Sequence, residues 1–369
     1  MKEIRKIIRA YDEWRQQKLA MALATVVKVE ESSYRRIGAR MLVTDVGPFI
    51  GGISGGCLEG DALKKAKLAI HSKTSSKVVY DTLEDDDYQI GVGLGCNGRI
   101  EILFTPIDQD DPQNPVELLR QTIEANRPAI LLKVIASEAA DLLGQSKLLI
   151  DDVTNISFAQ FDSAALDAAV ANVLGRKKPK VLLQDEGSSE ILVEYLRPET
   201  RLLIVGNNYD VNAMIGIARE LGWQVSVMAR KAKVLKSIAQ AVDKVYDYDE
   251  VATIPQDEHT AVVLMTHDYH WDMKMLPHFI SGKIAYLGML GPRKRFDKMN
   301  AELLDNGFAT DLETVMHLHA PTGLDIGAES PEEISLSIAA EILSVFRQRN
   351  GQRLKQREGT IHEREPLQI

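Results

Sequence analysis

The feature that most constrains this chain is a change of pattern after Pro198. From Arg201 onward, a short apolar run, a polar or glycine-containing loop and a segment with helical spacing repeat in turn. The apolar runs cover residues 202–205, 224–228, 261–265 and 283–287. Continuous apolar runs are typical of buried parallel strands, and their alternation with helices predicts a doubly wound sheet.

The first half of the chain has a different, mixed pattern. Helical spacing predicts helices over residues 2–18, 57–72, 116–124 and 164–174, and apolar runs predict strands over 21–29, 40–44, 49–51, 77–80, 99–104 and 129–136. A strand ends just before Pro198, so this proline is the expected boundary. We therefore expect an α/β protein, with an N-terminal mixed α/β domain (1–197) followed by a Rossmann-like doubly wound parallel-sheet domain (198–369).

Composition excludes several classes of partner. The net charge is −9 at 369 residues, and no segregated basic face is visible, so nucleic acid and anionic membranes are disfavoured. No apolar run is long enough to span a bilayer, and the N-terminus lacks a signal-peptide pattern. With only two cysteines there is no disulfide framework, so we expect a cytoplasmic protein.

The first glycine-rich segment, residues 51–60, contains Gly55, Gly56, Cys57 and Glu59. Dense glycine lets a ligand approach the backbone closely, and consecutive N–H groups can point at an anion. Cys57 falls where a helix should begin, and a helix N-terminus favours the reactive thiolate. A tight turn with an inert, buried cysteine remains the alternative interpretation.

A second segment, residues 91–98, repeats this composition with Gly95 and Cys96 just before a strand. The two segments hold every cysteine of the chain, so Cys57 and Cys96 could face one another across a soft metal or a sulfur-containing ligand. Two thiolates do not complete a zinc site. A pair of unrelated buried cysteines is the alternative.

A third segment follows the strand that ends at Val205. Gly206 occupies the position of the first glycine in a dinucleotide fingerprint, but Asn208 stands where the second glycine should let the pyrophosphate approach. Ala229 stands where an acid would bind the ribose hydroxyls. Arg230 and Lys231 would suit a 2′-phosphate. The pattern thus predicts the fold and disfavours conventional NAD or NADP binding.

Other polar loops follow later strands at the edge where open α/β sheets bind ligands. The candidate binding residues in these loops are His267, Asp268, Gly291, Arg293 and Asp325. Their loops should meet in one cleft, although a lone histidine is more often structural and Asp268 could simply cap the next helix.

Several longer motifs resemble the XdhC/CoxI family. They are EESSYRRIGARM (residues 30–41), GGCLEGD (55–61), GCNG (95–98), YLGMLG (286–291) and GLDIGAESPEEI (323–334). The match keeps the same order from about residue 10 to 346. The chain departs from the family's usual GAGH at residues 206–209, from an acid at Ala229 and from glycine at Asn97.

The resemblance implies an accessory protein of xanthine-dehydrogenase-like or carbon-monoxide-dehydrogenase-like molybdenum hydroxylases. Such a protein holds the molybdenum cofactor (molybdopterin) as cargo, supports its sulfuration with a cysteine desulfurase and delivers it to the client enzyme. We also expect a homodimer. Xanthine dehydrogenase activity itself is not expected, because two cysteines cannot supply iron–sulfur clusters. The rival hypotheses are an NAD(P)-dependent oxidoreductase and a non-catalytic interaction scaffold.

Overall fold

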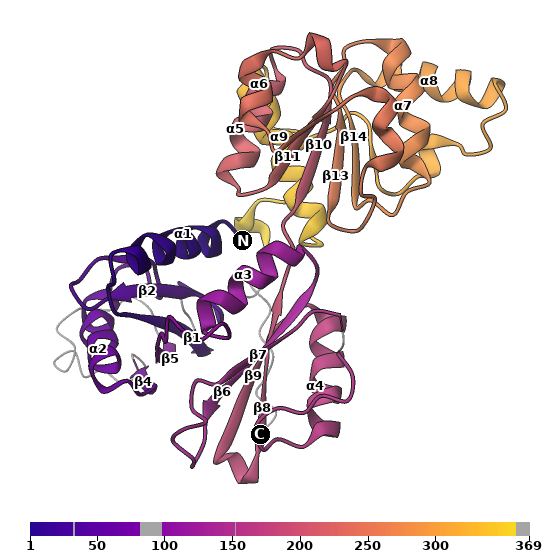
Figure 1. Cartoon of the computed structure of the whole chain (residues 1–369). Helices are drawn as coiled ribbons and strands as arrows, with labels where there is room; N and C mark the ends of the chain where they lie inside the picture. Colours follow the sequence, from indigo (N-terminus) through magenta and orange to yellow (C-terminus); the bar gives the residue numbers. More distant parts are fainter. Residues whose placement is uncertain (32–33, 82–97, 152, 359–369) are drawn as a thin grey trace. The chain divides into compact units, whose positions relative to one another are not determined.

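The computed structural model describes residues 1–31, 34–81, 98–151 and 153–358. The chain divides into two compact units, Met1–Pro198 (unit 1) and Glu199–Ile369 (unit 2) (Figure 1). Each unit has its own sheets and its own hydrophobic clusters.

Unit 1 begins with a five-stranded antiparallel sheet in the order β3-β2-β1-β5-β4. Its elements are α1 (Lys2–Gln16), β1 (Met21–Glu31), β2 (Arg40–Thr44), β3 (Phe49–Gly51), α2 (Glu59–Ser72), β4 (Ser76–Asp81) and β5 (Gly98–Pro106). Alternate residues of β1 point to opposite faces, as the two-residue period of a strand requires. Ala24 and Val26 pack with α2, whereas Leu23 packs with α1.

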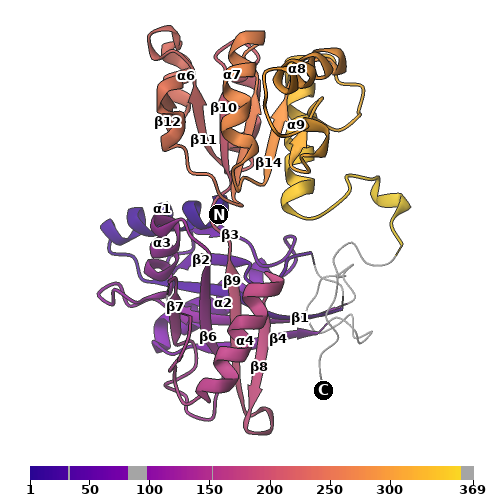
Figure 2. The same cartoon turned by 90° about the vertical axis from the view of Figure 1, so that its right-hand side faces the viewer.

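A second antiparallel sheet completes unit 1, in the order β7-β6-β9-β8. Its elements are α3 (Pro115–Ala125), β6 (Ala129–Ala136), β7 (Ser146–Leu149), α4 (Ser163–Arg176), β8 (Lys180–Gln184) and β9 (Ser189–Leu196). Figure 2 shows α4 lying across this sheet, and the opposite face contacts the first sheet where Ile135 and Leu192 meet Val27 and Leu103. Strand β6 and helix α4 were predicted from the sequence, but the face-to-face packing of the two sheets was not.

Several charged side chains are buried between the two sheets of unit 1, and Arg40, Lys133 and Glu194 form one group among them. Arg40 of β2 donates a hydrogen bond of 2.5 Å to Glu194 of β9. Lys133 of β6 is fully buried beside them, and its neighbours two residues away, Leu131 and Ile135, point into the same layer. Burial and, to a smaller extent, the charge of Arg40 lower the pKa of Lys133 to about 8, and Glu194 opposes the shift.

Unit 2 is a six-stranded, wholly parallel sheet in the order β12-β11-β10-β13-β14-β15. Its elements are β10 (Arg201–Val205), α5 (Val211–Glu220), β11 (Gln224–Met228), α6 (Lys236–Ala241), β12 (Lys244–Tyr246), β13 (Thr260–Leu264), α7 (Tyr269–Ile280), β14 (Tyr286–Met289), α8 (Arg293–Asp305), β15 (Leu318–His319) and α9 (Pro331–Phe346). Helices α5, α6 and α9 cover one face and α7 and α8 the other (Figure 1). The predicted doubly wound fold is confirmed.

The strand order of unit 2 fixes where a ligand can bind. The chain runs outward from β10 to β12, then returns to β13 and continues in the opposite direction. The crossover helices therefore diverge between β10 and β13, and open α/β sheets bind ligands in the crevice outside the carboxyl ends of such strands. We call this edge the switch point.

The bounds of two elements differ from those expected from the sequence. Strand β14 begins at Tyr286 rather than Lys283 and includes Gly288, which was assigned to the following loop. A Cβ at Gly288 would lie 2.5 Å from Thr322 Oγ1, so glycine is required here by close packing inside the sheet. Helix α2 begins at Glu59, two residues after Cys57.

Candidate functional site

The first candidate site is the thiol loop, residues 51–59, between β3 and α2. Glu59 closes this loop on itself. Its Oε1 accepts the backbone N–H groups of Ser54 (2.9 Å) and Ile53 (3.2 Å), and its Oε2 accepts the Ser54 hydroxyl (2.5 Å). Burial raises the pKa of Glu59, but these hydrogen bonds outweigh it and hold that pKa below its ordinary value. Glu59 therefore stays ionised and shapes the loop.

The remaining groups of the thiol loop divide into bound amides and an exposed thiol. Ser54 Oγ accepts the N–H groups of Leu58 (3.0 Å) and Gly56 (3.3 Å), so these amides are satisfied within the loop. Gly56 has φ +112°, a conformation that side chains rarely adopt. Cys57 is exposed. The loop thus presents its sulfur to solvent, while the four amides bound by Glu59 and Ser54 are not available to a phosphate.

The predicted partners Gly95 and Cys96 lie outside the described residues. The strand ends on either side of them are described. Gly98 pairs with Glu31, and Asp81 pairs with Arg99, next to it. Strand β3 ends at Gly51, which pairs with Met41 at the start of β2. In this antiparallel sheet these positions all lie at one end, so the thiol loop and both flanks of residues 82–97 share the same end of the sheet.

The second candidate site is the switch point of unit 2. Gly206 follows β10 with φ +140°, and a Cβ there would lie 2.4 Å from Met265 O. The turn is therefore pressed against the backbone that follows β13. Asn208 Nδ2 donates to Thr266 O across the same gap, at 3.0 Å. The position where a dinucleotide fingerprint keeps a bare glycine is thus occupied by a side chain that bridges the two strands.

A histidine and an aspartate form a second bridge across the switch point. His267 Nε2 lies 2.6 Å from Asp210 Oδ2. Asp210 is only 7% exposed, whereas the His267 side chain is 52% exposed. His267 adopts a left-handed conformation with φ +56°, which turns it away from the line of β13.

A buried ion pair supports the loop after β13. Thr266 Oγ1 donates to Asp272 Oδ1 at 2.6 Å, and Arg295 of α8 donates to Asp272 Oδ2. Asp272 is almost completely buried. Burial raises the pKa of Asp272 despite the hydrogen bond from Thr266 and the charge of Arg295. Asp268 caps α7 by accepting the N–H groups of His270 and Trp271, which is the structural alternative considered for it.

The other predicted residues lie on neighbouring loops of unit 2. Gly291 and Arg293 stand at the N-terminus of α8, where the Arg293 guanidinium is exposed and pairs with Asp297 and Glu313. Asp325 is in the loop before α9. That loop is anchored by Glu341, which accepts the Gly323 N–H at 2.8 Å and the Tyr286 hydroxyl at 2.5 Å.

The region after β11 is arranged differently from a dinucleotide site. Ala229 is buried. The Arg230 guanidinium lies over the Trp271 ring, 5.4 Å from its centroid, and Lys231 Nζ pairs with Glu250 at 2.5 Å. Both cations proposed for a 2′-phosphate are therefore engaged with protein groups.

Sequence reasoning missed Asp210, Asp272 and Arg295. Asp210 lies at the start of α5, far in the sequence from its partner His267. Asp272 and Arg295 are separated by 22 residues and meet only because α7 and α8 cover the same face of the sheet. The sequence did contain a signal for one of these residues, Asp272. Asp272 falls within the apolar spacing of α7, on the face that also buries Met275, Leu276 and Phe279.

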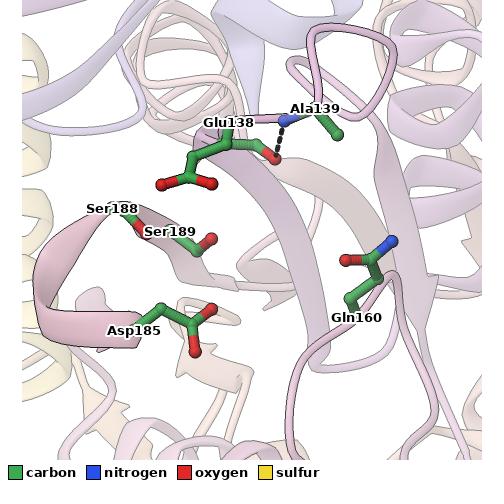
Figure 3. Close-up of a pocket in the computed structure, with 7 residues that line it drawn as sticks. Glu138, Ala139, Gln160, Asp185, Ser188 and Ser189 are labelled. Atoms are coloured by element: carbon green, nitrogen blue, oxygen red, sulfur yellow. Dashed lines mark hydrogen bonds between the residues drawn. The ribbon is translucent and has the colours of Figure 1, made fainter.

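A polar cavity of about 740 Å³ lies elsewhere in unit 1. Figure 3 shows Ser189 between the carboxylates of Glu138 and Asp185, with Gln160 nearby. Ser137 Oγ accepts the Ala139 N–H there at 3.1 Å. None of the predicted site residues lines this cavity. Within the described ranges, no three His, Cys, Asp or Glu side chains are grouped so as to hold a metal ion, and no described helix could cross a membrane.

Comparisons with known proteins match both units. A model described as the XdhC and CoxI family matches residues 14–81, and a model described as the XdhC Rossmann domain matches residues 202–342. A Bacillus subtilis protein named as a probable subunit of xanthine dehydrogenase is 28% identical, covering 87% of this chain and 92% of that protein. The Escherichia coli molybdenum cofactor insertion chaperone PaoD is 22% identical, covering 88% and 82%.

A solved structure has the same fold. The crystal structure described as a xanthine dehydrogenase from Bacillus halodurans superposes with a TM-score of 0.74 at 25% identity, covering 93% of this chain and 96% of that one. The motifs of both units, their order and these similarities agree. Each unit of the chain is therefore similar to the matching part of the XdhC and CoxI family.

Proposed function

We propose that this protein is an accessory protein that binds the molybdenum cofactor, supports its sulfuration and delivers it to a xanthine-dehydrogenase-like molybdenum hydroxylase. The observation that carries the proposal is the exposed Cys57 on a loop fixed by Glu59. The relative named as a molybdenum cofactor insertion chaperone supports the accessory role. Cargo binding, a cysteine desulfurase partner, a homodimer and a cytoplasmic location are further parts of the proposal.

In this proposal Cys57 and Cys96 supply the soft donors. A thiolate is a ligand that molybdenum accepts and a site to which sulfur can be transferred, which the hard oxygen ligands of the loop are not. Gly55 and Gly56 leave room for the cargo to approach, and Glu59 orients the loop. The cofactor's phosphate must be held by groups other than the amides already bound to Glu59 and Ser54.

The proposed binding residues of unit 2 are Gly206, Asn208, His267, Asp268, Gly291, Arg293 and Asp325. Six of them stand on loops at the carboxyl edge of the sheet or at helix starts beside it, and Asp325 stands on the loop before α9. We assign them to a phosphate-bearing ligand. Their arrangement argues against a nicotinamide dinucleotide, because Asn208 bridges the crevice and no acid follows β11.

The test of the cargo proposal is to purify the protein and measure bound pterin by fluorescence and molybdenum by elemental analysis, for the wild type and for Cys57→Ala. Ser188→Ala, on the edge of the separate polar cavity, is the matched control. The proposal expects Cys57→Ala to lose most of the retained cofactor and of client activation while remaining folded. Full client activation by the Cys57→Ala, Cys96→Ala double variant would reject it.

The dinucleotide alternative has its own measurement. Titration of the wild type with NAD and NADP by calorimetry should give dissociation constants weaker than about 1 mM. Asn208→Gly removes the bridge to Thr266 and is the variant in which any latent dinucleotide site should open. Micromolar binding by the wild type would instead favour an oxidoreductase.

A further inference from the structure

Asp210 stands at the N-cap position of α5 but does not cap the helix. Its side chain makes no capping hydrogen bond, unlike Asp268 at α7 and Ser330 at α9. Instead, Oδ2 holds His267, and the buried Oδ1 has no hydrogen-bond partner within the described part of the chain. A carboxyl oxygen buried without a hydrogen-bond partner costs free energy, so a purely structural role does not account for this side chain.

The bond to Asp210 also decides what His267 presents to solvent. A carboxylate at Nε2 favours the tautomer with the proton on Nε2, which leaves the lone pair on Nδ1. The ring is about half exposed, so one side is held by Asp210 while the other remains accessible. The strained φ of His267 keeps the ring at this position, and such outliers concentrate at functional sites.

The loop after β14 and the start of α8 bring positive charge to the same carboxyl edge of the sheet. Leu290 N donates to Leu264 O at 3.0 Å, which places the start of the β14–α8 loop directly beside the end of β13. Helix α8 then begins with Arg293, Lys294 and Arg295, of which Arg293 also pairs with Asp297 and Glu313. Arg295 reaches Asp272 of α7, and its Nε has no partner among the described residues. Cations added to the positive end of a helix dipole favour an anion.

We propose that Asp210 and His267 form a proton-accepting dyad in a site for a small phosphorylated compound that carries a hydroxyl group, with the phosphate at the start of α8. The ligand hydroxyl donates a hydrogen bond to Nδ1 of His267, and Asp210 holds the ring in place through Nε2. The dyad is independent of the thiol loop, and it narrows the phosphate-bearing ligand proposed above for the loops of unit 2 to a hydroxylated, phosphorylated small molecule.

The test uses three probes on the full ¹⁵N-labelled chain: ribose 5-phosphate, ribose and inorganic phosphate. Imidazole nitrogen signals of His267, identified by their absence in His267→Gln, report both the tautomer and ligand contact. Ribose 5-phosphate should shift these signals and saturate, and the two fragments should bind at least about tenfold more weakly, because each makes only part of the charged contacts.

Two variants separate a ligand site from a structural pair. Asp210→Asn should change the tautomer signature and weaken ribose 5-phosphate binding at least about tenfold. His270→Gln, an exposed histidine in the first turn of α7, is the matched control and should change neither. Cys57→Ala should also bind normally, so failure of the cargo proposal is distinguishable. The dyad is overturned if no probe perturbs His267, or if Asp210→Asn binds ribose 5-phosphate like the wild type.

Discussion

The two units of this chain bury charged groups in different places. In unit 1 the Arg40–Glu194 pair and Lys133 lie between two sheets, while the exposed Cys57 is on a loop at the sheet's end. In unit 2 Asp210 and Asp272 are buried at the carboxyl edge of the strands, where open sheets bind ligands. Desolvation has the same effect in both units, since it favours the neutral forms of Lys133 and Asp272.

The difference teaches that a buried charge alone does not mark a functional site. Lys133 has no route to a ligand because it is enclosed by both sheets, so its charge belongs to the packing of unit 1. Asp210 is buried to a similar degree, but its partner His267 is half exposed. A buried carboxylate that is hydrogen-bonded to an accessible titratable group therefore indicates a functional site better than a buried charge alone does.

The largest expected effect is on the supporting ion pair of unit 2. Arg295→Ala leaves Asp272 buried without its cation, and removal of one partner of a buried pair costs about 3–5 kcal/mol. Arg293→Ala is the matched control, because Arg293 is half exposed and should matter by less than about 1 kcal/mol. Urea unfolding followed by Trp223 and Trp271 fluorescence measures both. Equal effects of the two variants would mean that the pair is not buried.

The pH dependence of the free energy of unfolding tests whether Lys133 is buried in unit 1. Its pKa is about 8 in the folded chain and about 10.5 when unfolded, so between these values the unfolded chain binds more protons. Stability should therefore rise with pH across this window, by about 3 kcal/mol from this one group. Lys133→Met should remove that rise relative to wild type.

The same variant should also be more stable at neutral pH, because no charge has to be buried. Lys64→Met, at an exposed position on α2, is the control for the loss of one positive charge. Unfolding of unit 1 followed by Trp14 fluorescence at pH 7 and pH 10 measures both predictions. A pH slope that is unchanged in Lys133→Met would show that Lys133 reaches water.

Glu59 tests whether the thiol loop is shaped by its own carboxylate. The folded pKa of Glu59 is lowered, so its stabilisation is present above the ordinary value near 4.5 and is lost as pH falls through the folded value. Glu59→Gln should raise the hydrogen-exchange rate of the Ser54 amide about tenfold at neutral pH, since a charged hydrogen bond is lost. Glu13→Gln on α1 should leave it unchanged. Unaltered exchange would contradict this role.

The smallest effect is expected at the start of α9. Ser330 caps this helix by accepting the Glu333 N–H at 3.2 Å, and Glu333 accepts the Ser330 N–H in return. Ser330→Ala should lower the stability of unit 2 by about 1 kcal/mol. Urea unfolding measures it, and a loss comparable to that of Arg295→Ala would mean that Ser330 also contacts something else.

Much of the fold could be predicted because its signals are local. Strands β2 and β3 are fixed by short stretches of sequence, and both match the expected ranges 40–44 and 49–51. Strands β12 and β15 contain only three and two residues, too few for a pattern to show. Strand β14 was expected at residues 283–287 but spans Tyr286–Met289, because Thr322 and Tyr286 pack closely around Gly288 inside the strand.

The candidate sites were less predictable because they depend on contacts between distant segments. Glu59 was predicted to bind a ligand, and its proximity to Ser54 shows that its oxygens are already engaged within the loop. The Asp210–His267 pair joins residues 57 positions apart, and it exists only because β13 lies beside β10. The positions of Asp210 and His267 in the sequence do not reveal that β10 and β13 are neighbours in the sheet.

Helix α9 has a consequence for how the protein folds during synthesis. Ile338, Ala339 and Ile342 of α9 pack against Leu202 and Ile204 of β10, the strand made first in unit 2. Helix α5 follows this strand directly and shares the same cluster, but the cluster is completed only when α9, more than 120 residues after β10, has left the ribosome. Unit 1 contains all of its strands before β10 is made, so we expect it to fold first and unit 2 to depend on a late, long-range contact.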